Sequence, residues 1–439
     1  MTSFSFAHLA DLHLDTPFTG VRSRAPELAR VLRDASLDAW DRAVALCLEA
    51  GVDFVLLAGD IYDGAAVGVR AQLRFRDGLR RLSDAGVASF VVHGNHDPRG
   101  GRWTAVADWP ERVTVFGHHE VTAAYALRDG VPVALVHGLS HAGPNVTENL
   151  AARFTRDPSF GGFQVGLLHA NIDRRGGNEN YAPATLSDLR HAGLDYWALG
   201  HVHARAVLST GRPLAIYPGN LQARDPGEAG TKGFYVVEVA DGEPTARFVS
   251  AGVVNFLTVD VDIGADLADL DAVRERLVQA ALGASEDASA VSGTTDSGGA
   301  TVGLKAQHVV MRARVRGMGP AHDGLRKAGE VGLLLYLQDV APDGVWWDEV
   351  RISTRPPLDR AARMAAGDFV ADLLEVSMER RHEAPDTVGR LLDELLGNRS
   401  LQAVRQELGL DRLLAEADDI WDEAETLAFD LLSDAGSGA

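Results

Sequence analysis

The chain has 439 residues, 46% hydrophobic and 24% charged, which is typical of a globular protein with two or three domains. Its formal net charge of −20 excludes a protein that coats nucleic acid with a basic surface. Cys47 is the single cysteine, which excludes the disulfide-rich secreted class. Because residues 1–6 lack a signal-peptide pattern and no apolar run approaches ~18 residues, we expect a cytoplasmic protein without a membrane span.

Over the first 250 residues, short apolar runs alternate with helical patterns. The predicted strands are Phe4–Leu9, Asp53–Leu57, Ala88–Val92, Val131–Val136, Gln164–Leu168, Asp195–Leu199, Leu214–Tyr217 and Phe234–Val239. The predicted helices are Pro26–Ala50 and Val67–Ala85. This alternation predicts βαβ units and an α/β sheet with helices outside. The denser strands after Val113 indicate a mixed sheet or a β-sandwich.

The pattern changes from Phe256 onward. Predicted strands are Phe256–Ile263, His308–Val315 and Trp346–Ser353, and predicted helices are Asp266–Leu282 and Pro320–Val340. Gly283–Gly303 is rich in Ser, Gly, Thr and Asp and predicts a loop. We therefore expect a domain at 1–250, a small α+β domain at 251–355 with a flexible loop near 283–304, and a helical region at 356–439. That last region is acidic, with 8 Arg against 19 Asp and Glu, a net charge of −11.

Polar segments that suit a two-metal centre follow five of the predicted strands. They are Asp11-Leu12-His13, Gly59-Asp60, Gly94-Asn95-His96-Asp97, His169 and Gly200-His201-Val202-His203. Ligand sites of α/β sheets usually form at strand ends, and residues two apart in extended backbone point the same way. Carboxylate, imidazole and amide ligands suit Mn, Fe or Zn better than Ca or Mg, which prefer oxygen ligands.

Each of these residues also has a purely structural interpretation. Asp60 could serve as a turn residue, since Asp is common in turns. His169 alone would more often be a hydrogen-bonded histidine in the core. His201 and His203 together are harder to explain by packing, because burying two imidazoles requires several polar partners.

The ordered series DxH, GD, GNHD, H and GHxH resembles the calcineurin-like metallophosphoesterase superfamily over roughly the first half of the chain. The resemblance implies a four-layer α/β fold, a β-sandwich flanked by helices, followed by a small α+β capping domain and a C-terminal helical region. It also implies a role for each motif residue. Asp11, His13 and His203 would bind one metal, Asn95, His169 and His201 the other, Asp60 would bridge them, His96 would be the catalytic histidine, and Asp97 would orient it.

Two further segments resemble the SbcD/YhaO-type DNA repair exonuclease branch. They are Phe6-Ala7-His8-Leu9-Ala10-Asp11-Leu12-His13-Leu14-Asp15 and Tyr217-Pro218-Gly219-Asn220-Leu221-Gln222. This implies a DNA exonuclease or endonuclease that acts in DNA repair with two divalent ions, Mn first and Fe or Zn as alternatives. A metal-bridging hydroxide would attack the phosphodiester. The implied partners are DNA, a second copy of the chain, and an SbcC-like SMC-type ATPase bound through 356–439.

The chain departs from that branch at one place, where Ala223-Arg224-Asp225 replaces the usual Gly-Arg-His. We retain Arg224 as a substrate-binding candidate. Two other functions stay open, a small-nucleotide phosphodiesterase and a non-catalytic adaptor for an SMC-like ATPase. Arg70, Arg74 and Arg81 share a helix face, for which a solvated surface is favoured over DNA contact.

Overall fold

A computed structural model describes residues 3–21, 26–64, 68–100, 108–174, 180–289, 302–304, 306–357 and 369–396, with ten further positions between 364 and 428. Its contacts divide the chain into two units. The first comprises 1–259, 277–313 and 334–350, and the second comprises 260–276, 314–333 and 351–439. None of the described helices is long and apolar enough to cross a membrane.

The first unit contains a seven-stranded sheet in the order β14-β12-β11-β1-β2-β3-β4. Its strands are β1 (Phe4–Leu9), β2 (Phe54–Ala58), β3 (Ala88–Val92), β4 (Val113–Val115), β11 (Gly233–Ala240), β12 (Glu243–Ser250) and β14 (Val302–Gly303). Strands β1 to β4 pair in parallel, and β11 joins β1 antiparallel with Phe4 opposite Val239. The carboxyl ends of the parallel strands therefore meet at one edge.

The second sheet has six strands in the order β5-β6-β7-β8-β10-β9. They are β5 (Thr122–Arg128), β6 (Val131–Leu139), β7 (Phe163–His169), β8 (Tyr196–Gly200), β9 (Ala206–Ser209) and β10 (Leu214–Tyr217). Strands β6, β7, β8 and β10 are parallel, with His169 opposite Gly200. His169 and the residues after Gly200 thus lie side by side.

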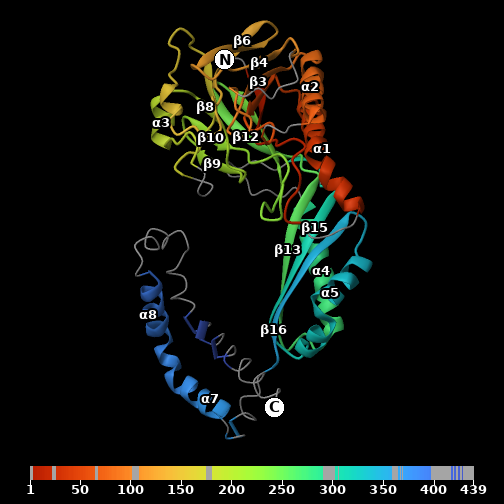
Figure 1. Cartoon of the computed structure of the whole chain (residues 1–439). Helices are drawn as coiled ribbons and strands as arrows, with labels where there is room; N and C mark the ends of the chain where they lie inside the picture. Colours follow the sequence, from red (N-terminus) through yellow and green to blue (C-terminus); the bar gives the residue numbers. More distant parts are fainter. Residues whose placement is uncertain are drawn as a thin grey trace. The chain divides into compact units, whose positions relative to one another are not determined.

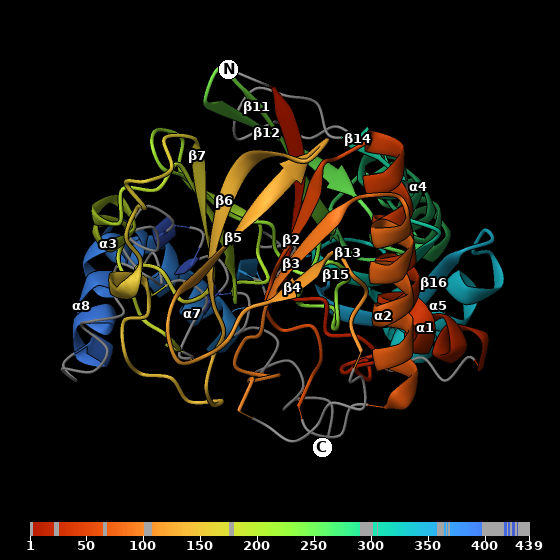
Figure 2. The same cartoon turned by 90° about the horizontal axis from the view of Figure 1, so that it is seen from above.

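Apolar packing stacks the two sheets face to face. Phe6, Phe54 and Val165 belong to one buried cluster formed by residues of both sheets. On the first sheet, Leu57 packs with Trp40 of α1 (Pro26–Ala50) and with α2 (Val69–Asp84). On the second, Trp197 packs with α3 (Leu186–His191) and the short helix η1 (Ala151–Arg153). Figures 1 and 2 show α1 and α2 on one side of the sheets and α3 on the other, which confirms the four-layer α/β prediction.

Three long strands follow, and they form a separate sheet in the order β13-β15-β16. These are β13 (Val254–Ile263), β15 (His308–Met318) and β16 (Val345–Arg355), with helices α4 (Leu270–Ser289) and α5 (His322–Asp339) between them in sequence. The described C-terminal helices are α7 (Phe369–Arg380), η2 (Arg381–Glu383) and α8 (Ala384–Leu396). In the second unit, Ser377 of α7 bonds Glu425 and accepts from Trp421 at 2.9 Å.

The structure differs from the expected boundaries at the segment after α4. The predicted helix end at Leu282 is wrong, because α4 continues to Ser289, which removes the start of the expected 283–303 loop. Ala284 and Ala288 favour continuation, since alanine has the highest helix propensity. Val302 pairs with Val249 instead of ending a loop. The positions 290–301 lie outside the described residues.

Candidate metal centre

The loops that follow β1 and β2 lie together at the carboxyl edge of the first sheet. The backbone N–H of Asp11 donates to the Gly59 carbonyl at 3.1 Å, and that of His13 donates to the Asp60 carbonyl at 3.0 Å. Asp11, His13 and Asp60 all have positive φ values, 51°, 42° and 50°. Non-glycine residues seldom adopt this conformation, and it concentrates at functional sites. Here this backbone conformation directs the three buried polar side chains toward one point.

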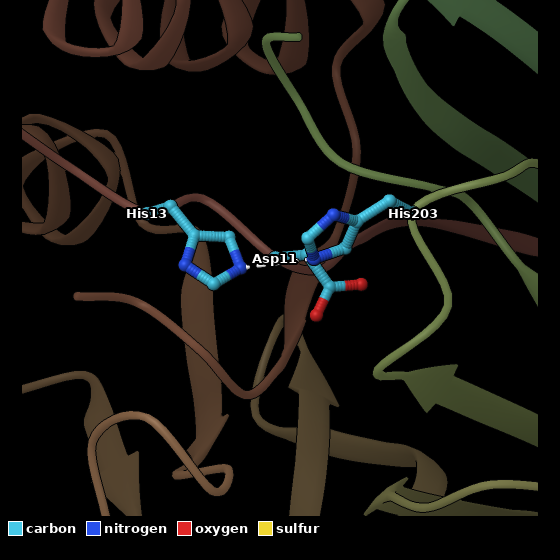
Figure 3. Close-up of side chains that lie close together, drawn as sticks. All are labelled: Asp11, His13 and His203. Atoms are coloured by element: carbon cyan, nitrogen blue, oxygen red, sulfur yellow. Dashed lines mark hydrogen bonds between the residues drawn. The ribbon is translucent and has the colours of Figure 1, made fainter. Parts of the chain in front are cut away.

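The first group of ligand atoms comes from Asp11, His13 and His203 (Figure 3). The Nε2 atoms of His13 and His203 lie 3.1 Å apart. The Nδ1 atom of His203 lies 2.6 Å from the Glu228 carboxylate, which holds the ring proton there and leaves Nε2 with its lone pair. In this structure His13 Nε2–H can donate to that lone pair. A divalent cation can replace the shared proton, so the donor set fits a metal.

The second group comes from Asp11, Asp60 and His169, with Asn95 beside them. His169 Nδ1 donates to the Ala58 carbonyl at 2.9 Å, and its Nε2 lies 3.0 Å from Asn95 Oδ1 and 3.3 Å from Asp60 Oδ2. His201 Nδ1 lies 3.3 Å from the same Asn95 oxygen. The structure therefore brings together all seven residues that the sequence predicts as metal ligands.

Two glycines make this approach sterically feasible. A Cβ on Gly94 would collide with the Asp60 carboxylate and lie 2.8 Å from the His169 ring. A Cβ on Gly200 would collide with the Ala58 carbonyl and lie 2.9 Å from His169 Nδ1. Only glycine leaves room for the imidazole between the two sheets.

In this group, a proton on an imidazole balances the charge of the buried carboxylates, as a bound cation would. Burial lowers the pKa of His169, but the Asp60 and Asp11 carboxylates outweigh it and raise that pKa to about 9. Burial acts to raise the pKa of Asp60, but the charge of His169 outweighs it and holds the pKa well below its usual range. Burial raises the pKa of Asp11. Because the ligands must be deprotonated, metal binding would release the His169 proton.

His96 lies beside this centre. The carboxylate that contacts its ring is that of Asp63, not that of Asp97 as expected. Its Nδ1 lies 2.5 Å from Asp63 Oδ1, and its backbone N–H donates to Asp60 at 3.0 Å. The hydrogen bond to Asp63 raises the pKa of His96, against the effect of its partial burial. Asp63 was not predicted from the sequence, although it stands three positions after Asp60 in the same loop.

The expected role of Asp97 in orienting His96 is not what the structure shows. The Asp97 carboxylate accepts hydrogen bonds from the backbone N–H of Gly94 at 2.7 Å and of Ile61 at 2.8 Å. It also lies 3.1 Å from His93 Nδ1. A fully buried carboxylate is satisfied best by several donors, so Asp97 ties the loop after β3 to the loop after β2.

Arg224 lies in the same centre. Its Nη1 is 3.2 Å from His13 Nδ1 and 3.3 Å from Asp63 Oδ2, and its Nη2 is 3.4 Å from His203 Nδ1. Its backbone N–H donates to Glu228 at 2.7 Å. The sequence-predicted substrate contact is thus placed within reach of the predicted ligands. Glu228 was missed, and its position four residues after Arg224 is the only signal in the sequence.

The Glu228 carboxylate contacts several polar groups at once. Besides His203 and Arg224, it accepts a hydrogen bond of 2.7 Å from Asn220 Nδ2. Burial acts to raise the Glu228 pKa, but the hydrogen bond and charge of His203 outweigh it and lower the pKa to about 2. Glu228 therefore stays ionised and fixes the tautomer of His203 at neutral pH.

A cavity of about 780 Å³ opens onto these residues. Its lining includes Asp60, His96, His201, His203, Arg205, Arg224, Glu228, Thr231 and Lys232. All of these belong to the first unit. Pockets of this size accommodate a small ligand or a segment of a polymer.

The arginines of α2 are not part of this site. Arg70 pairs with Asp34 at 2.6 Å, and Arg74 pairs with Asp38 at 3.3 Å and with Asp41. These acids lie on α1, so the ion pairs tie the two helices together. This agrees with the favoured surface role and leaves no support for DNA contact by this face.

Comparison with known proteins agrees with the geometry. Residues 4–205 match the family model of calcineurin-like phosphoesterases. The chain is 37% identical over 263 residues to the uncharacterized metallophosphoesterase YhaO of Bacillus subtilis, covering 60% of this chain and 64% of that protein. It is 28% identical over 297 residues to the DNA double-strand break repair protein Mre11 of Methanopyrus kandleri, covering 62% and 60%.

A third relative is the SbcD component of the nuclease SbcCD of Bacillus subtilis, 26% identical over 275 residues, covering 54% of this chain and 66% of that protein. The chain thus spans less than two thirds of the length of each of these relatives. Residues 4–205 are thus similar to calcineurin-like phosphoesterases, and the chain is similar to the YhaO, Mre11 and SbcD proteins over 60%, 62% and 54% of its length.

Proposed function

We propose that this protein is a two-metal DNA phosphodiesterase of the SbcD/YhaO type, an exonuclease or endonuclease that acts in DNA repair in the cytoplasm. The observation that carries the proposal is the convergence of seven ligand candidates at neighbouring strand ends, with His96 and Arg224 lining the same cavity. The names of two relatives, a double-strand break repair protein and a nuclease component, support DNA as the substrate.

The proposed ions are two Mn, with Fe or Zn as alternatives, because carboxylate, imidazole and amide donors suit these metals. Asp11, His13 and His203 would hold one ion, and Asn95, His169 and His201 the other, with Asp60 shared. When bound, such ions neutralise phosphate charge and lower the pKa of a coordinated water. Glu228 and the Ala58 carbonyl prepare the ligands, since each fixes the tautomer of one imidazole.

The chain itself supplies an acid and an anion clamp. Asp63 favours the protonated form of His96, which we propose donates a proton to the leaving oxygen. Arg224 presents two guanidinium nitrogens toward the centre, and a planar fork suits two phosphate oxygens. Because both groups are already held by hydrogen bonds, little ordering remains on substrate binding.

We also propose the domain organisation and partners that the resemblance implies. In it, 1–250 is the catalytic domain, 251–355 a capping domain, and 356–439 the region that binds an SbcC-like ATPase. Exposed apolar side chains on the C-terminal helices support the last point. They are Phe369, Val376 and Met378 of α7 and Leu391 of α8, with exposed fractions of 69%, 50%, 54% and 55%. A homodimer is part of the same proposal.

The test is hydrolysis of end-labelled single- and double-stranded DNA by the metal-free protein after addition of Mn. Bis-p-nitrophenyl phosphate and cyclic nucleotides run in parallel. We expect Mn-dependent cleavage of DNA that falls roughly 10²–10⁴-fold in His96→Ala, the range for a positioned general acid. His119→Ala, an exposed histidine on a loop, is the matched control.

Other outcomes would replace the proposal. Cleavage of small diesters with DNA intact, even with an SbcC-like ATPase present, would assign a small-nucleotide phosphodiesterase. Full activity of Asp60→Asn would show that the assigned ligand set is wrong. No hydrolysis of any substrate, together with ATPase binding, would assign an adaptor.

A further inference from the structure

The cavity extends beyond the predicted ligands to a second cationic wall. Arg205, just before β9, lines it together with Thr231 and Lys232, just before β11. Lys232 Nζ donates to the His203 carbonyl at 3.3 Å, so this wall adjoins the metal centre directly. Neither Arg205 nor Lys232 is a predicted metal ligand. Both are also distinct from His96, the proposed acid, and Arg224, the proposed anion clamp.

The guanidinium of Arg205 is held in place by an aromatic ring. Its Cζ lies 4.2 Å from the centroid of the Phe248 ring, a cation–π distance. Phe248 is buried between the sheets and packs edge-on against Tyr235. The Arg205 backbone also lies close to Gly219, since a Cβ added there would lie 3.1 Å from the Arg205 nitrogen. An exposed arginine thus rests on a rigid part of the core.

Among the described residues, Arg205 lines the cavity without an anionic partner, in contrast to several arginines of the first unit. Arg70, Arg74 and Arg156 each pair with a carboxylate. Within the part of the chain that the structure describes, no carboxylate lies within ion-pair distance of Arg205. In a chain of net charge −20, a fixed cation without a partner beside a phosphoesterase centre offers a site for an external anion.

Lys232 adds a second, largely buried positive charge at this end of the cavity. Its side chain is 8% exposed, and it approaches the carbonyl of a predicted ligand instead of a carboxylate. The loop before it, from Gly227 to Thr231, forms the adjoining wall. The wall therefore joins one exposed and one buried positive charge with a short, glycine-containing backbone segment.

We propose that Arg205, supported by Lys232, binds a second phosphate of the substrate, next to the phosphodiester that is cleaved. This inference rests on the proposed function and deepens it by assigning residues that bind a phosphate next to the scissile one. The metal centre and Arg224 already provide for one phosphodiester, so a further fixed cation selects substrates that carry a neighbouring phosphate. That class is the polynucleotide strand, as opposed to an isolated small diester.

The first experiment measures kcat/KM with Mn for TpT, pTpT and TpTp, which share one scissile diester and differ in a neighbouring phosphate. We expect the wild type to prefer pTpT or TpTp over TpT by roughly tenfold, the effect of one charge-assisted hydrogen bond. Arg205→Gln should abolish this preference, because it should lower kcat/KM for pTpT and TpTp by about tenfold more than for TpT. Arg205→Lys should keep most of the preference, and Arg190→Gln on α3 is the matched control.

The second experiment needs no metal. Binding of a fluorescent oligonucleotide is followed by anisotropy in a chelator over a series of salt concentrations. For Arg205→Gln, we expect the slope of log affinity against log salt to fall by about 1, the signature of one lost phosphate contact. Arg190→Gln should keep the wild-type slope.

The outcomes separate the two proposals. If the wild type cleaves TpT but shows no preference for the phosphorylated forms, or if Arg205→Gln keeps that preference and the salt slope, the second phosphate subsite is wrong and the hydrolase stands. If the wild type cleaves none of the substrates, the proposed function fails. A loss of slope without cleavage would keep Arg205 as a phosphate contact in a binding protein.

Discussion

Asp97 is next to His96 in the sequence, but the carboxylate that contacts the His96 ring is that of Asp63, in the loop after β2. Asp63→Asn should therefore lower kcat, because a neutral amide no longer favours the protonated imidazole. We expect a loss of at least about tenfold, but smaller than the roughly 10²–10⁴-fold loss expected for His96→Ala as the general acid. Steady-state kinetics at fixed Mn, with bound metal measured by mass spectrometry, tests this.

Asp97→Asn is the comparison for that variant. Asp97 accepts hydrogen bonds from two backbone N–H groups. Its replacement should therefore lower the Tm, while kcat falls less than in Asp63→Asn. If Asp97→Asn reduced kcat as strongly as His96→Ala while Asp63→Asn had no effect, the pairing seen in the structure would not be the functional one.

Glu228 acts on the metal centre through His203. Glu228→Gln should weaken Mn affinity roughly 10–100-fold, the usual cost of losing the partner of a ligand histidine. Isothermal titration calorimetry of the metal-free protein measures this without any substrate. Glu238→Gln, an exposed glutamate on β11, should bind Mn like the wild type. Equal affinity in Glu228→Gln would reduce Glu228 to a packing role.

The sequence predicted the candidate ligands that the structure brings together, but not the residues that contact and orient them. Ligands such as Asp11 and His203 occupy motifs with a fixed spacing next to strands. Asp63 and Glu228 act across loops, and their partners lie 33 and 25 positions away. Such pairings depend on which loops the fold brings together, within one sheet for Asp63 and between the two sheets for Glu228, and local patterns do not encode this.

Strands and helices with strong apolar patterns were predicted closely. The bounds of β1, β3, β10 and α1 match those expected from the sequence. The strand β5 was missed because most of its residues are exposed at a sheet edge, and β9 because its residues are only half-buried. Edge strands lack the buried run or clean alternation on which a prediction depends.

Helix α3 offers a test of local structure by pH. Its N-cap Thr185 and Asp188 form a capping box, and hydrogen bonds from Thr185 lower the Asp188 pKa from 3.8. Because this pKa is lowered in the folded state, its stabilising effect is complete at pH 7. That effect is lost as the pH falls through the folded-state pKa.

We therefore expect Asp188→Asn to weaken α3 at pH 7 by up to about 1 kcal/mol, the value of a capping interaction. The difference from the wild type should shrink below pH 3.8. Hydrogen exchange of the α3 amides, corrected for intrinsic rates, measures it. Glu120→Gln, on an exposed loop, should show no difference at any pH. A difference that persisted unchanged in acid would mean that Asp188 acts through packing.

Metal binding should couple to the stability of the entire first unit, because its ligands come from both sheets. Asp11 and Asp60 follow strands of one sheet, whereas His169 ends a strand of the other. These side chains are buried, and before a cation binds their charges are compensated by one another and by backbone N–H groups that donate to Asp11 and Asp60. A ligand at 100 times its Kd stabilises the native state by about 2.7 kcal/mol. Mn should therefore raise the Tm of the metal-free protein, as measured by calorimetry.

Asp60→Asn separates this coupling from general salt effects. The Asp60 carboxylate lies 3.8 Å from His13 Nε2 and 3.3 Å from His169 Nε2, so it contacts a residue of each group, and its replacement should remove most of the Mn-dependent rise in Tm. Ca should raise the Tm less than Mn in the wild type, because imidazole ligands are poor partners for Ca. An equal rise with Mn in wild type and Asp60→Asn would place the stabilising ion elsewhere. The same result would mean that no ion bound at Asp60 joins the two sheets, as the proposed chemistry requires.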